Sequence, residues 1–364
     1  MSGDVSARQA RGSTRDRRLG STIAVGAILA IIAVSGLYFF SDARALARAL
    51  DRFNWSLLPL ALALTIWNYL FRFLKWEIYL RRLETRILPW RISLLVFLSA
   101  FAMSITPGKA GELIKCALLK RIANTPPSRA TAIVVAERLT DGLAMIVLAA
   151  VGAWQFSTGR PVLAVAVVAA AGAVLLLSRP IHLRRLLDRL PSLPVVGNVE
   201  NHLESFFAAS GTLVTPRLLA AGTAIGVVAW LGECVAFFVI LVGLGVPATS
   251  HLLLISAFVL AVSSLAGALS LLPGGLGVAE ASVAGMLVAF VPGPAMNHAV
   301  AAAATLLIRF ATLWFAVILG ALALAVLRRT SDFRSSPDRD DSGSIVTSTR
   351  PLTPDRVSRH TLGR

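Results

Sequence analysis

The stretch Thr106-Pro107-Gly108-Lys109-Ala110-Gly111-Glu112 interrupts an apolar region of the chain, between residues 92–105 and 113–119. Its core returns near the other end of the chain as Pro273-Gly274-Gly275-Leu276-Gly277-Val278-Ala279-Glu280. Each copy joins a Pro-Gly break to a nearby glutamate inside strongly hydrophobic sequence. Helix breakers and carboxylates are costly at membrane depth. We therefore expect the chain to be organised around these two polar breaks.

The composition is that of an integral membrane protein. Of the 364 residues, 56% are hydrophobic and only 15% are charged. Several apolar runs approach or exceed the roughly 20 residues that cross a bilayer as a helix. We therefore expect an all-α polytopic membrane protein. The net charge of +16 does not indicate nucleic-acid binding, because the Lys and Arg residues lie mainly in tails and in loops between apolar runs.

The distribution of charge predicts about six transmembrane helices, with both termini in the cytoplasm and the protein in the plasma (bacterial inner) membrane. The first apolar run could be either a cleaved signal peptide or a retained transmembrane helix, and its length favours the helix. Lys75 is assigned, with the arginines that follow it, to a cytoplasmic basic cluster. The predicted spans are residues 23–40, 57–74, 130–154, 161–177, 218–242 and 299–327.

The expected domain organisation is a single transmembrane domain, residues 21–327, between two polar tails. Residues 1–20 form a basic cytoplasmic tail, and residues 328–364 are rich in Ser, Asp, Arg and Pro and are expected to be disordered. Residues 181–210 are expected to form a cytoplasmic amphipathic segment, because leucines and arginines lie on opposite helical faces there.

Two further apolar segments, residues 92–121 and 252–291, are expected to be re-entrant helical hairpins with the Pro-Gly breaks at their tips. Each arm of the first has about 14 residues, or roughly 21 Å of helix, which is short for a bilayer core. Its flanks are basic, whereas those of the second lack Lys and Arg, so the two hairpins enter from opposite faces. Residues 252–272 are long enough to cross completely, and that alternative stays open. The order of elements indicates an inverted-topology repeat, which in transporters places a site near the midplane.

The breaks themselves suit an anion. Proline removes a backbone donor and glycine permits positive φ, so the chain can turn sharply within the membrane. Such a turn frees backbone N–H groups, and the N-terminus of the next helix favours a negative charge such as a phosphate headgroup. The alternative is that they are ordinary loop turns. The predicted turn residues are Pro107, Gly108, Gly111, Pro273, Gly274, Gly275 and Gly277.

Charged side chains inside the apolar segments are the candidate substrate-binding residues. They are expected to face a cavity or each other, because exposure to lipid would be very expensive. Arginine is suited to bidentate phosphate binding. Simpler roles are helix capping by glutamate, snorkelling by lysine and buried structural ion pairs. The candidates are Lys109, Glu112, Lys115, Glu137, Arg138, Asp141, Glu280 and Arg309, and Arg309 is expected to pair with Glu280, Glu112 or a ligand phosphate.

Motifs for other chemistry are missing from the sequence. There is no phosphate-binding loop, no nucleophile elbow and no zinc motif, and the two cysteines and five histidines lack metal-ligand spacing. No catalytic residue, metal or cofactor is therefore expected, and neither is ATP-driven pumping.

Four stretches of the sequence together resemble the lysylphosphatidylglycerol synthase transmembrane-region family of flippase-like membrane proteins. The resemblance covers roughly residues 20–327. In two-domain relatives, this region translocates an aminoacylated phospholipid that a cytoplasmic synthase domain makes. The polar tail of this chain is too short to form such a domain. We therefore expect a stand-alone form without aminoacylation activity. The matching stretches are residues 106–115, 137–141 and 272–280 and the pattern Arg309-x-x-Thr-x-Trp314.

The resemblance implies translocation of a membrane phospholipid or a lipid-linked sugar, with the headgroup in a midplane polar groove. Two alternatives stay open. The chain could be the membrane partner of a separately encoded synthase or glycosyltransferase. It could also be a lipid-headgroup transferase with Glu137 and Asp141 as acid and base, although no nucleophile–base pair is evident.

Overall fold

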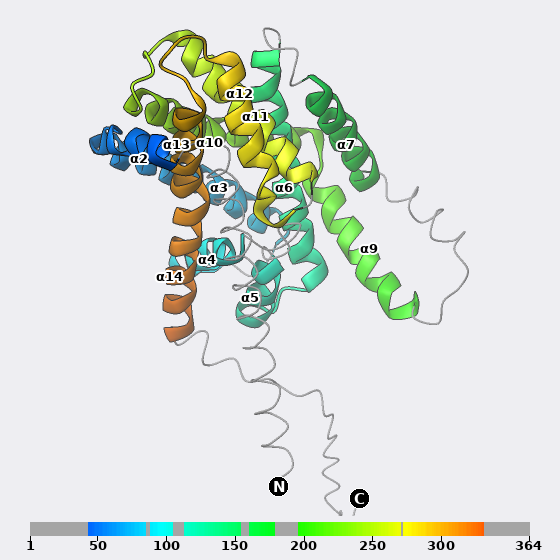
Figure 1. Cartoon of the computed structure of the whole chain (residues 1–364). Coiled ribbons are helices and arrows are strands. Elements are labelled where there is room, and N and C mark those ends of the chain that lie inside the picture. The colour runs from blue at the N-terminus through cyan, green and yellow to red at the C-terminus, as the bar shows by residue number, and fades with distance from the viewer. Residues whose placement is uncertain are drawn as a thin grey trace, which may run out of the picture.

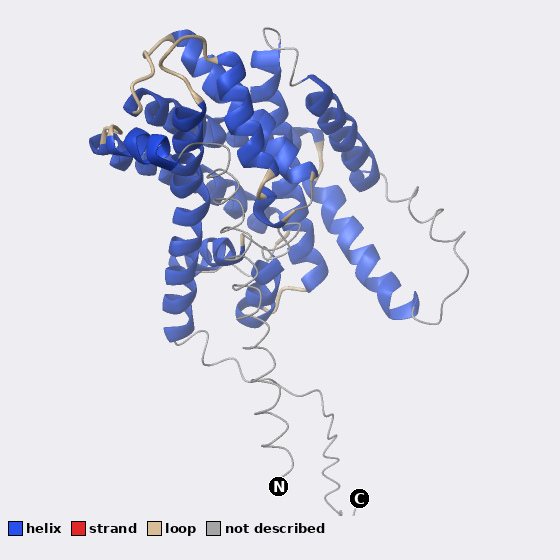
Figure 2. Ribbon diagram, viewed as in Figure 1, coloured by secondary structure: helices blue, strands red, loops and turns tan. Residues whose placement is uncertain are grey.

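A computed structural model of the chain describes residues 43–84, 88–104, 113–153, 160–178, 196–270 and 272–330. Helices dominate this part of the chain, and it contains no strand (Figure 2). The predicted first span and most of both tails lie outside the described residues. The same holds for the first Pro-Gly break, and with it Pro107, Gly108, Lys109, Gly111 and Glu112.

Six of the described helical segments are long and apolar enough to cross a membrane, which confirms the predicted all-α polytopic class. The set differs from the predicted one. It includes residues 250–269 and 273–290, the two arms of the second predicted hairpin, and omits residues 127–153, a helix long enough to span but rich in charge. Whether either hairpin is re-entrant stays a prediction.

Figure 1 shows the described helices in chain order, from α2 to α14. Their bounds are α2 Ala43–Asp51, η1 Trp55–Leu57, α3 Leu58–Arg82, α4 Trp90–Ser99, η2 Ala100–Met103, α5 Ile114–Ala123, α6 Pro127–Ala153, α7 Arg160–Ser178, α9 Val196–Leu213, α10 Pro216–Gly243, α11 Ser250–Leu269, η5 Pro273–Gly275, α12 Val278–Phe290, α13 His298–Arg309, η6 Phe310–Trp314 and α14 Phe315–Arg329.

Helices α3 and α10 pack extensively against each other. Glycines on α10 allow this approach: a Cβ on Gly232 would lie 2.9 Å from the carbonyl oxygen of Leu64 on α3. Gly226 lies equally close to α6, where an added Cβ would be 3.3 Å from the carbonyl oxygen of Thr140. Small residues at helix contacts are the usual means of tight packing in membranes.

Each helix pair beside a Pro-Gly break packs against a helix from the other half of the chain. Helix α4 and η2 pack on α14, where a Cβ on Gly320 would overlap the backbone of Ala102. Helix α11 packs on α6. The first arm of each pair therefore contacts the long helix that follows the other pair.

The turn between α11 and α12 has the geometry that its glycines predict. Gly274, Gly275 and Gly277 have φ values of 60°, 67° and 86°, a region that other residues enter only at a cost. Gly275 also passes so close to α11 that an added Cβ would lie 3.0 Å from the Cα atom of Gly267. Pro273 begins the short 3₁₀ helix η5 of this turn.

Two apolar clusters make up most of the core, and helix α6 runs through both. Ile133 and its buried neighbours on α6 belong to a cluster with Trp76 and Phe97. Met145, Leu148 and Ala149 of the same helix belong to a second cluster with Phe237 and Phe258. The charged stretch 137–141 lies between them. The fold thus holds a polar layer between two apolar clusters, and this layer contains the candidate site.

Candidate functional site

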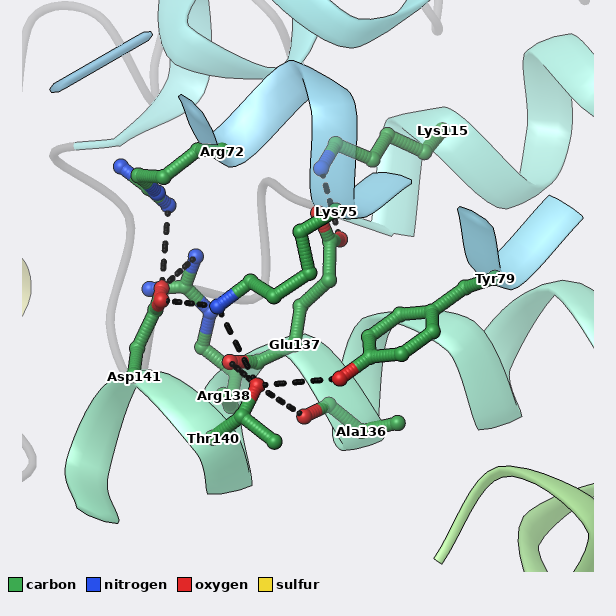
Figure 3. A network of polar contacts seen from close by, with 9 residues as sticks. All are labelled: Arg72, Lys75, Tyr79, Lys115, Ala136, Glu137, Arg138, Thr140 and Asp141. Carbon is green, nitrogen blue, oxygen red and sulfur yellow. Dashed lines mark hydrogen bonds and ion pairs between the residues drawn. The ribbon is translucent and has the colours of Figure 1, made fainter. Parts of the chain in front are cut away.

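Asp141 on α6 is the centre of the polar layer (Figure 3). Its Oδ1 atom lies 2.5 Å from Lys75 Nζ, and its Oδ2 atom lies 3.4 Å from Arg72 Nη2 and 3.2 Å from Arg138 Nη2. The Asp141 side chain is only 6% exposed. Three cations from two helices thus surround one buried carboxylate.

Helix α3 supplies two of these cations because one of its faces is polar. Asn68, Arg72, Lys75 and Tyr79 are separated by four, three and four residues, which places them on one side of a helix. All four are buried. The Nζ atom of Lys75 also donates to Thr140 Oγ1 at 3.1 Å, and the Tyr79 hydroxyl lies 3.3 Å from the same oxygen.

Lys115 and Glu137 form a second, separate ion pair. Lys115 Nζ lies 2.9 Å from Glu137 Oε2, and both side chains are 1% exposed. The ammonium also lies 4.7 Å and 4.6 Å from the ring centroids of Trp76 and Phe97. Cation–π attraction and the ion pair together offset the desolvation of two charges, so the pair joins α5 to α6 in a dry environment.

Arg309 and Glu280 hold the second Pro-Gly turn against α13. Arg309 Nε donates to Glu280 Oε1 at 2.5 Å, and its Nη2 donates to the carbonyl oxygen of Gly274 at 3.0 Å. The other carboxylate oxygen of Glu280 accepts from the backbone N–H of Gly277 at 2.6 Å. The predicted pairing of Arg309 with Glu280 is confirmed, and Glu280 also caps the first turn of α12.

Arg309 is the last residue of α13, directly before the π-helical segment η6. Segments of this kind are frequent at functional sites because they interrupt the regular hydrogen-bond ladder. Tyr69 on α3 donates its hydroxyl to the carbonyl oxygen of Thr312 in η6 at 3.0 Å. The π segment is thereby tied to the polar face of α3.

A cavity of about 140 Å³ lies between these elements. Among the described residues, three arginines and one carboxylate line it, namely Arg72, Arg138, Arg309 and Glu233. The Arg72 guanidinium sits between two aromatic rings, 5.5 Å from the Phe101 centroid and 5.7 Å from that of Trp230. A second cavity of about 230 Å³ adjoins the first and is lined by Arg138, Asp141, Gly142 and Leu272, among others.

The structure brings only some of the predicted site residues to these cavities. Arg138, Asp141 and Arg309 line them, and Glu280 holds Arg309 in place. Lys115 and Glu137 are absent from the cavity-lining residues of the described chain and bind each other instead. A substrate-binding role for any of these residues stays a prediction.

Sequence reasoning missed Arg72 and assigned Lys75 wrongly. The assignment of Lys75 to a cytoplasmic basic cluster fails because α3 continues to Arg82 and leaves the Lys75 side chain 1% exposed. Trp230 was missed because its role depends on the packing of α10 on α3. The signal available in the sequence was the helical spacing of polar residues along α3, which places Asn68 and Tyr79 on the same face as both cations.

A family model described as the lysylphosphatidylglycerol synthase TM region matches residues 23–320. The chain belongs to this family. A UPF0104 membrane protein from Methanothermobacter thermautotrophicus is 27% identical, over 81% of this chain and 90% of that protein. Membership confirms the resemblance noted in the sequence, supports a multi-pass integral membrane protein and fits a role connected with membrane lipids.

The arginine side chains that line this cavity are chemically suited to an anion. Across the described residues, no group of three or more His, Cys, Asp or Glu side chains is placed to hold a metal. Arginine side chains, by contrast, converge on one cavity, and guanidinium groups bind phosphate or carboxylate oxygens in a planar, bidentate geometry.

Proposed function

We propose that the protein translocates a membrane phospholipid or a lipid-linked saccharide, with the headgroup bound in the arginine-lined cavity. The convergence of three arginines on one cavity carries this proposal. Arg72, Arg138 and Arg309 all line it, and Glu233 is the carboxylate among its described lining residues.

Cationic groups at membrane depth are expensive, so a bound anion would stabilise several arginines that meet at one cavity. A phosphodiester supplies one negative charge. Arg72, Arg138 and Arg309 all line the cavity, whereas Lys75 is taken up by Asp141 and Thr140. Arg138 has the most exposed of the three arginine side chains, at 27%, and is the one we expect to reach the phosphate first.

We further propose that the helix pairs α4–α5 and α11–α12 are re-entrant hairpins of an inverted repeat. Three features support this. Helices α3 and α10, which precede the two pairs, pack together. The first arm of each pair packs on the long helix that follows the other pair. One ion pair ties each second arm to the following helix, Lys115–Glu137 in one half and Glu280–Arg309 in the other.

In such repeats, one half rocks against the other around a fixed site, which exposes the site to each face of the membrane in turn. The proposed location is the plasma membrane, with the N-terminus and the C-terminus in the cytoplasm. The polar layer between the two apolar clusters would then lie near the midplane, where the headgroup crosses.

Reconstitution into proteoliposomes tests the proposal. Fluorescent phospholipid in the inner leaflet becomes accessible to a membrane-impermeant quencher only after translocation. The native protein is expected to accelerate this step, and Arg138→Gln to slow it about tenfold, which corresponds to one charge-assisted hydrogen bond. Arg217→Gln is the matched control, because Arg217 is an exposed arginine at the start of α10. Equal rates for the native protein and both variants would contradict the site, and no acceleration by the native protein would contradict translocation.

Two other roles, a partner of a separate enzyme and a lipid-headgroup transferase, would give different results. A synthase or glycosyltransferase that co-purifies with the chain, together with no translocation by the chain alone, would favour a partner role. Formation of a modified lipid by the purified protein would favour a transferase, with Glu137 and Asp141 the residues to test. Glu137 is held by buried Lys115 and Asp141 by three cations, so neither carboxylate is placed as an accessible base.

A further inference from the structure

Helix α2 carries arginines at the end of the molecule where positive charge is not expected. Arg44, Arg48 and Arg52 follow one another at intervals of four residues. In Figure 1, α2 lies beside α13 in the upper part of the molecule, whereas α14 ends at the bottom. Lys and Arg normally concentrate on the cytoplasmic side of a membrane protein, and the proposed orientation places the lower end there. The arginines of α2 therefore need another explanation.

The connections beside α2 are uncharged. Residues 244–249, between α10 and α11, contain no charged side chain, and neither do residues 291–297, between α12 and α13. Both connections lie close to α2, because the backbone N–H of Asn54 donates to the carbonyl oxygen of Gly243 at 2.9 Å and α2 packs on α13. The arginines are thus a local feature of one helix, next to connections of the kind expected outside the cytoplasm.

Helix α2 is amphipathic, and its apolar face already packs inside the protein. Ala49 and Phe53 are buried, and Leu50 packs against the apolar cluster to which Phe53 belongs. The Phe53 ring fits against the end of α10, where a Cβ on Gly243 would lie only 2.5 Å from it. Because these contacts hold the apolar face, the arginine face is directed away from the core.

The arginine face is open to the surroundings of the protein. Arg44, Arg48 and Arg52 are all exposed. The Nε atom of Arg48 donates to the carbonyl oxygen of Arg44 at 3.2 Å. None of the ion pairs between described residues includes Arg48 or Arg52. At least two guanidinium groups on this face are therefore available to an external anion.

Trp55, just after α2, fits a position at the membrane interface. Its side chain is 53% exposed, and its ring meets that of Phe53 edge-on, with 5.2 Å between the centroids. Tryptophan is enriched where the hydrocarbon core meets the headgroups. Helix α3 then runs for 25 residues, about 37 Å, to the exposed Arg81 and Arg82. This length exceeds the hydrocarbon core, so α2 and these two arginines can lie at opposite interfaces.

We propose that α2 and Trp55 form a binding surface for anionic phospholipid headgroups in the non-cytoplasmic leaflet. Amphipathic helices with a basic face bind membrane interfaces more strongly when the lipids are anionic, and guanidinium groups suit phosphate oxygens. The surface is separate from the arginine-lined cavity, because neither Arg48 nor Arg52 is among the described residues that line either cavity. It therefore goes beyond the proposed translocation and does not depend on it.

The test compares two membranes that differ in charge. The full-length protein is placed in nanodiscs of phosphatidylcholine alone, or of an equal mixture of phosphatidylcholine and phosphatidylglycerol. Hydrogen–deuterium exchange with mass spectrometry follows the amides of residues 43–52, because a ligand that binds the folded helix slows its local opening. The variant is Arg48→Gln with Arg52→Gln. Its matched control is Arg328→Gln with Arg329→Gln, which removes two exposed arginines at the end of α14.

In the native protein, phosphatidylglycerol should slow exchange in residues 43–52 roughly 5-fold, the factor expected for one arginine near an anionic surface. The Arg48→Gln, Arg52→Gln variant should lose this effect, and the control should keep it. Asp51→Asn should enlarge it, because Asp51 is an exposed carboxylate directly beside Arg52 and repels anionic headgroups.

Equal exchange of native α2 in the two membranes would overturn the inference, as would an effect of phosphatidylglycerol that survives in the Arg48→Gln, Arg52→Gln variant. Slower exchange on addition of soluble poly-glutamate, with none from phosphatidylglycerol, would assign the surface to an acidic protein and would also overturn it. The signal comes from α2 and not from the cavity, so each of these results leaves the proposed translocation to its own test.

Discussion

Lys115 Nζ lies 2.9 Å from Glu137 Oε2, and both side chains are 1% exposed. This ion pair joins the helix after the first Pro-Gly break to the helix that carries Arg138 and Asp141. The corresponding contact in the second half, Glu280 with Arg309, has the opposite polarity, with the carboxylate on the arm and the cation on the following helix. In both halves a charge pair therefore fixes the arm next to the cavity.

The first prediction concerns the stability of that pair. Removing one partner, in Lys115→Ala or Glu137→Ala, leaves an uncompensated buried charge and should lower the free energy of unfolding by about 3–5 kcal/mol. The double variant Lys115→Met with Glu137→Met should recover most of this loss, because it buries no charge at all. Thermal unfolding in detergent measures the effect. Single variants as stable as the native protein would show that the pair is not buried as described.

The second prediction concerns the turn held by Arg309. Arg309→Ala removes both the bond to Glu280 and the bond to the Gly274 carbonyl, so backbone amides of residues 274–277 should exchange hydrogen faster. Glu280→Gln should have a smaller effect, because its amide oxygen can still accept from the Gly277 N–H. Hydrogen–deuterium exchange with mass spectrometry compares the two variants. Equal exchange in native and Arg309→Ala protein would contradict a role in holding the turn.

The third prediction uses Gly142, which lines the cavity of about 230 Å³ directly after Asp141. A Cβ at this position would meet no atom within 4 Å, so Gly142→Leu should fill cavity space without disturbing the fold. Translocation should fall several-fold while the melting temperature stays within a few degrees of the native value.

The control for the Gly142→Leu variant is Gly172→Leu. Gly172 is exposed on α7, and a Cβ there also meets no atom within 4 Å. It is absent from both sets of cavity-lining residues in the described chain. Equal translocation by the Gly142 and Gly172 variants would show that the cavity is not on the lipid path.

The fourth prediction concerns the contact between α14 and the end of α4. A Cβ on Gly320 would overlap the backbone at Ala102, so Gly320→Ala should destabilise the protein by about 1–3 kcal/mol, the usual cost of overpacking. Gly285→Ala in α12 meets open space and should be neutral or stabilising by about 0.5–1 kcal/mol, because alanine favours the helix. In thermal unfolding, the melting temperature of Gly320→Ala should therefore fall below that of the native protein, whereas that of Gly285→Ala should stay unchanged or rise.

Much of the fold could be predicted because it depends on local sequence. The lengths of the apolar runs predicted four spans whose ends lie within a few residues of the observed helix ends. These helices are α6, α7, α10 and the continuous segment α13–α14. The second Pro-Gly break predicted its own turn, since Gly274, Gly275 and Gly277 adopt the positive φ that only glycine takes easily. The pairing of Arg309 with Glu280 was one of three alternatives, and the structure selects it.

The candidate site was harder to predict because it depends on contacts between distant segments. Lys75 was misplaced because a lysine after an apolar run is normally the end of a span, whereas Asp141 compensates its charge inside the protein. Arg72 becomes part of the site only where Trp230 of α10 meets α3. Glu233 likewise reaches the cavity only through the packing of α10.

The most direct test of headgroup binding is a structure of the protein in lipid nanodiscs, at a resolution that shows bound headgroups. We expect phosphate density in the arginine-lined cavity, within hydrogen-bond distance of Arg138 and of Arg72 or Arg309. Lipid density confined to the outer surface, with Arg138 bonded only to Asp141 and the cavity free of phosphate, would contradict it.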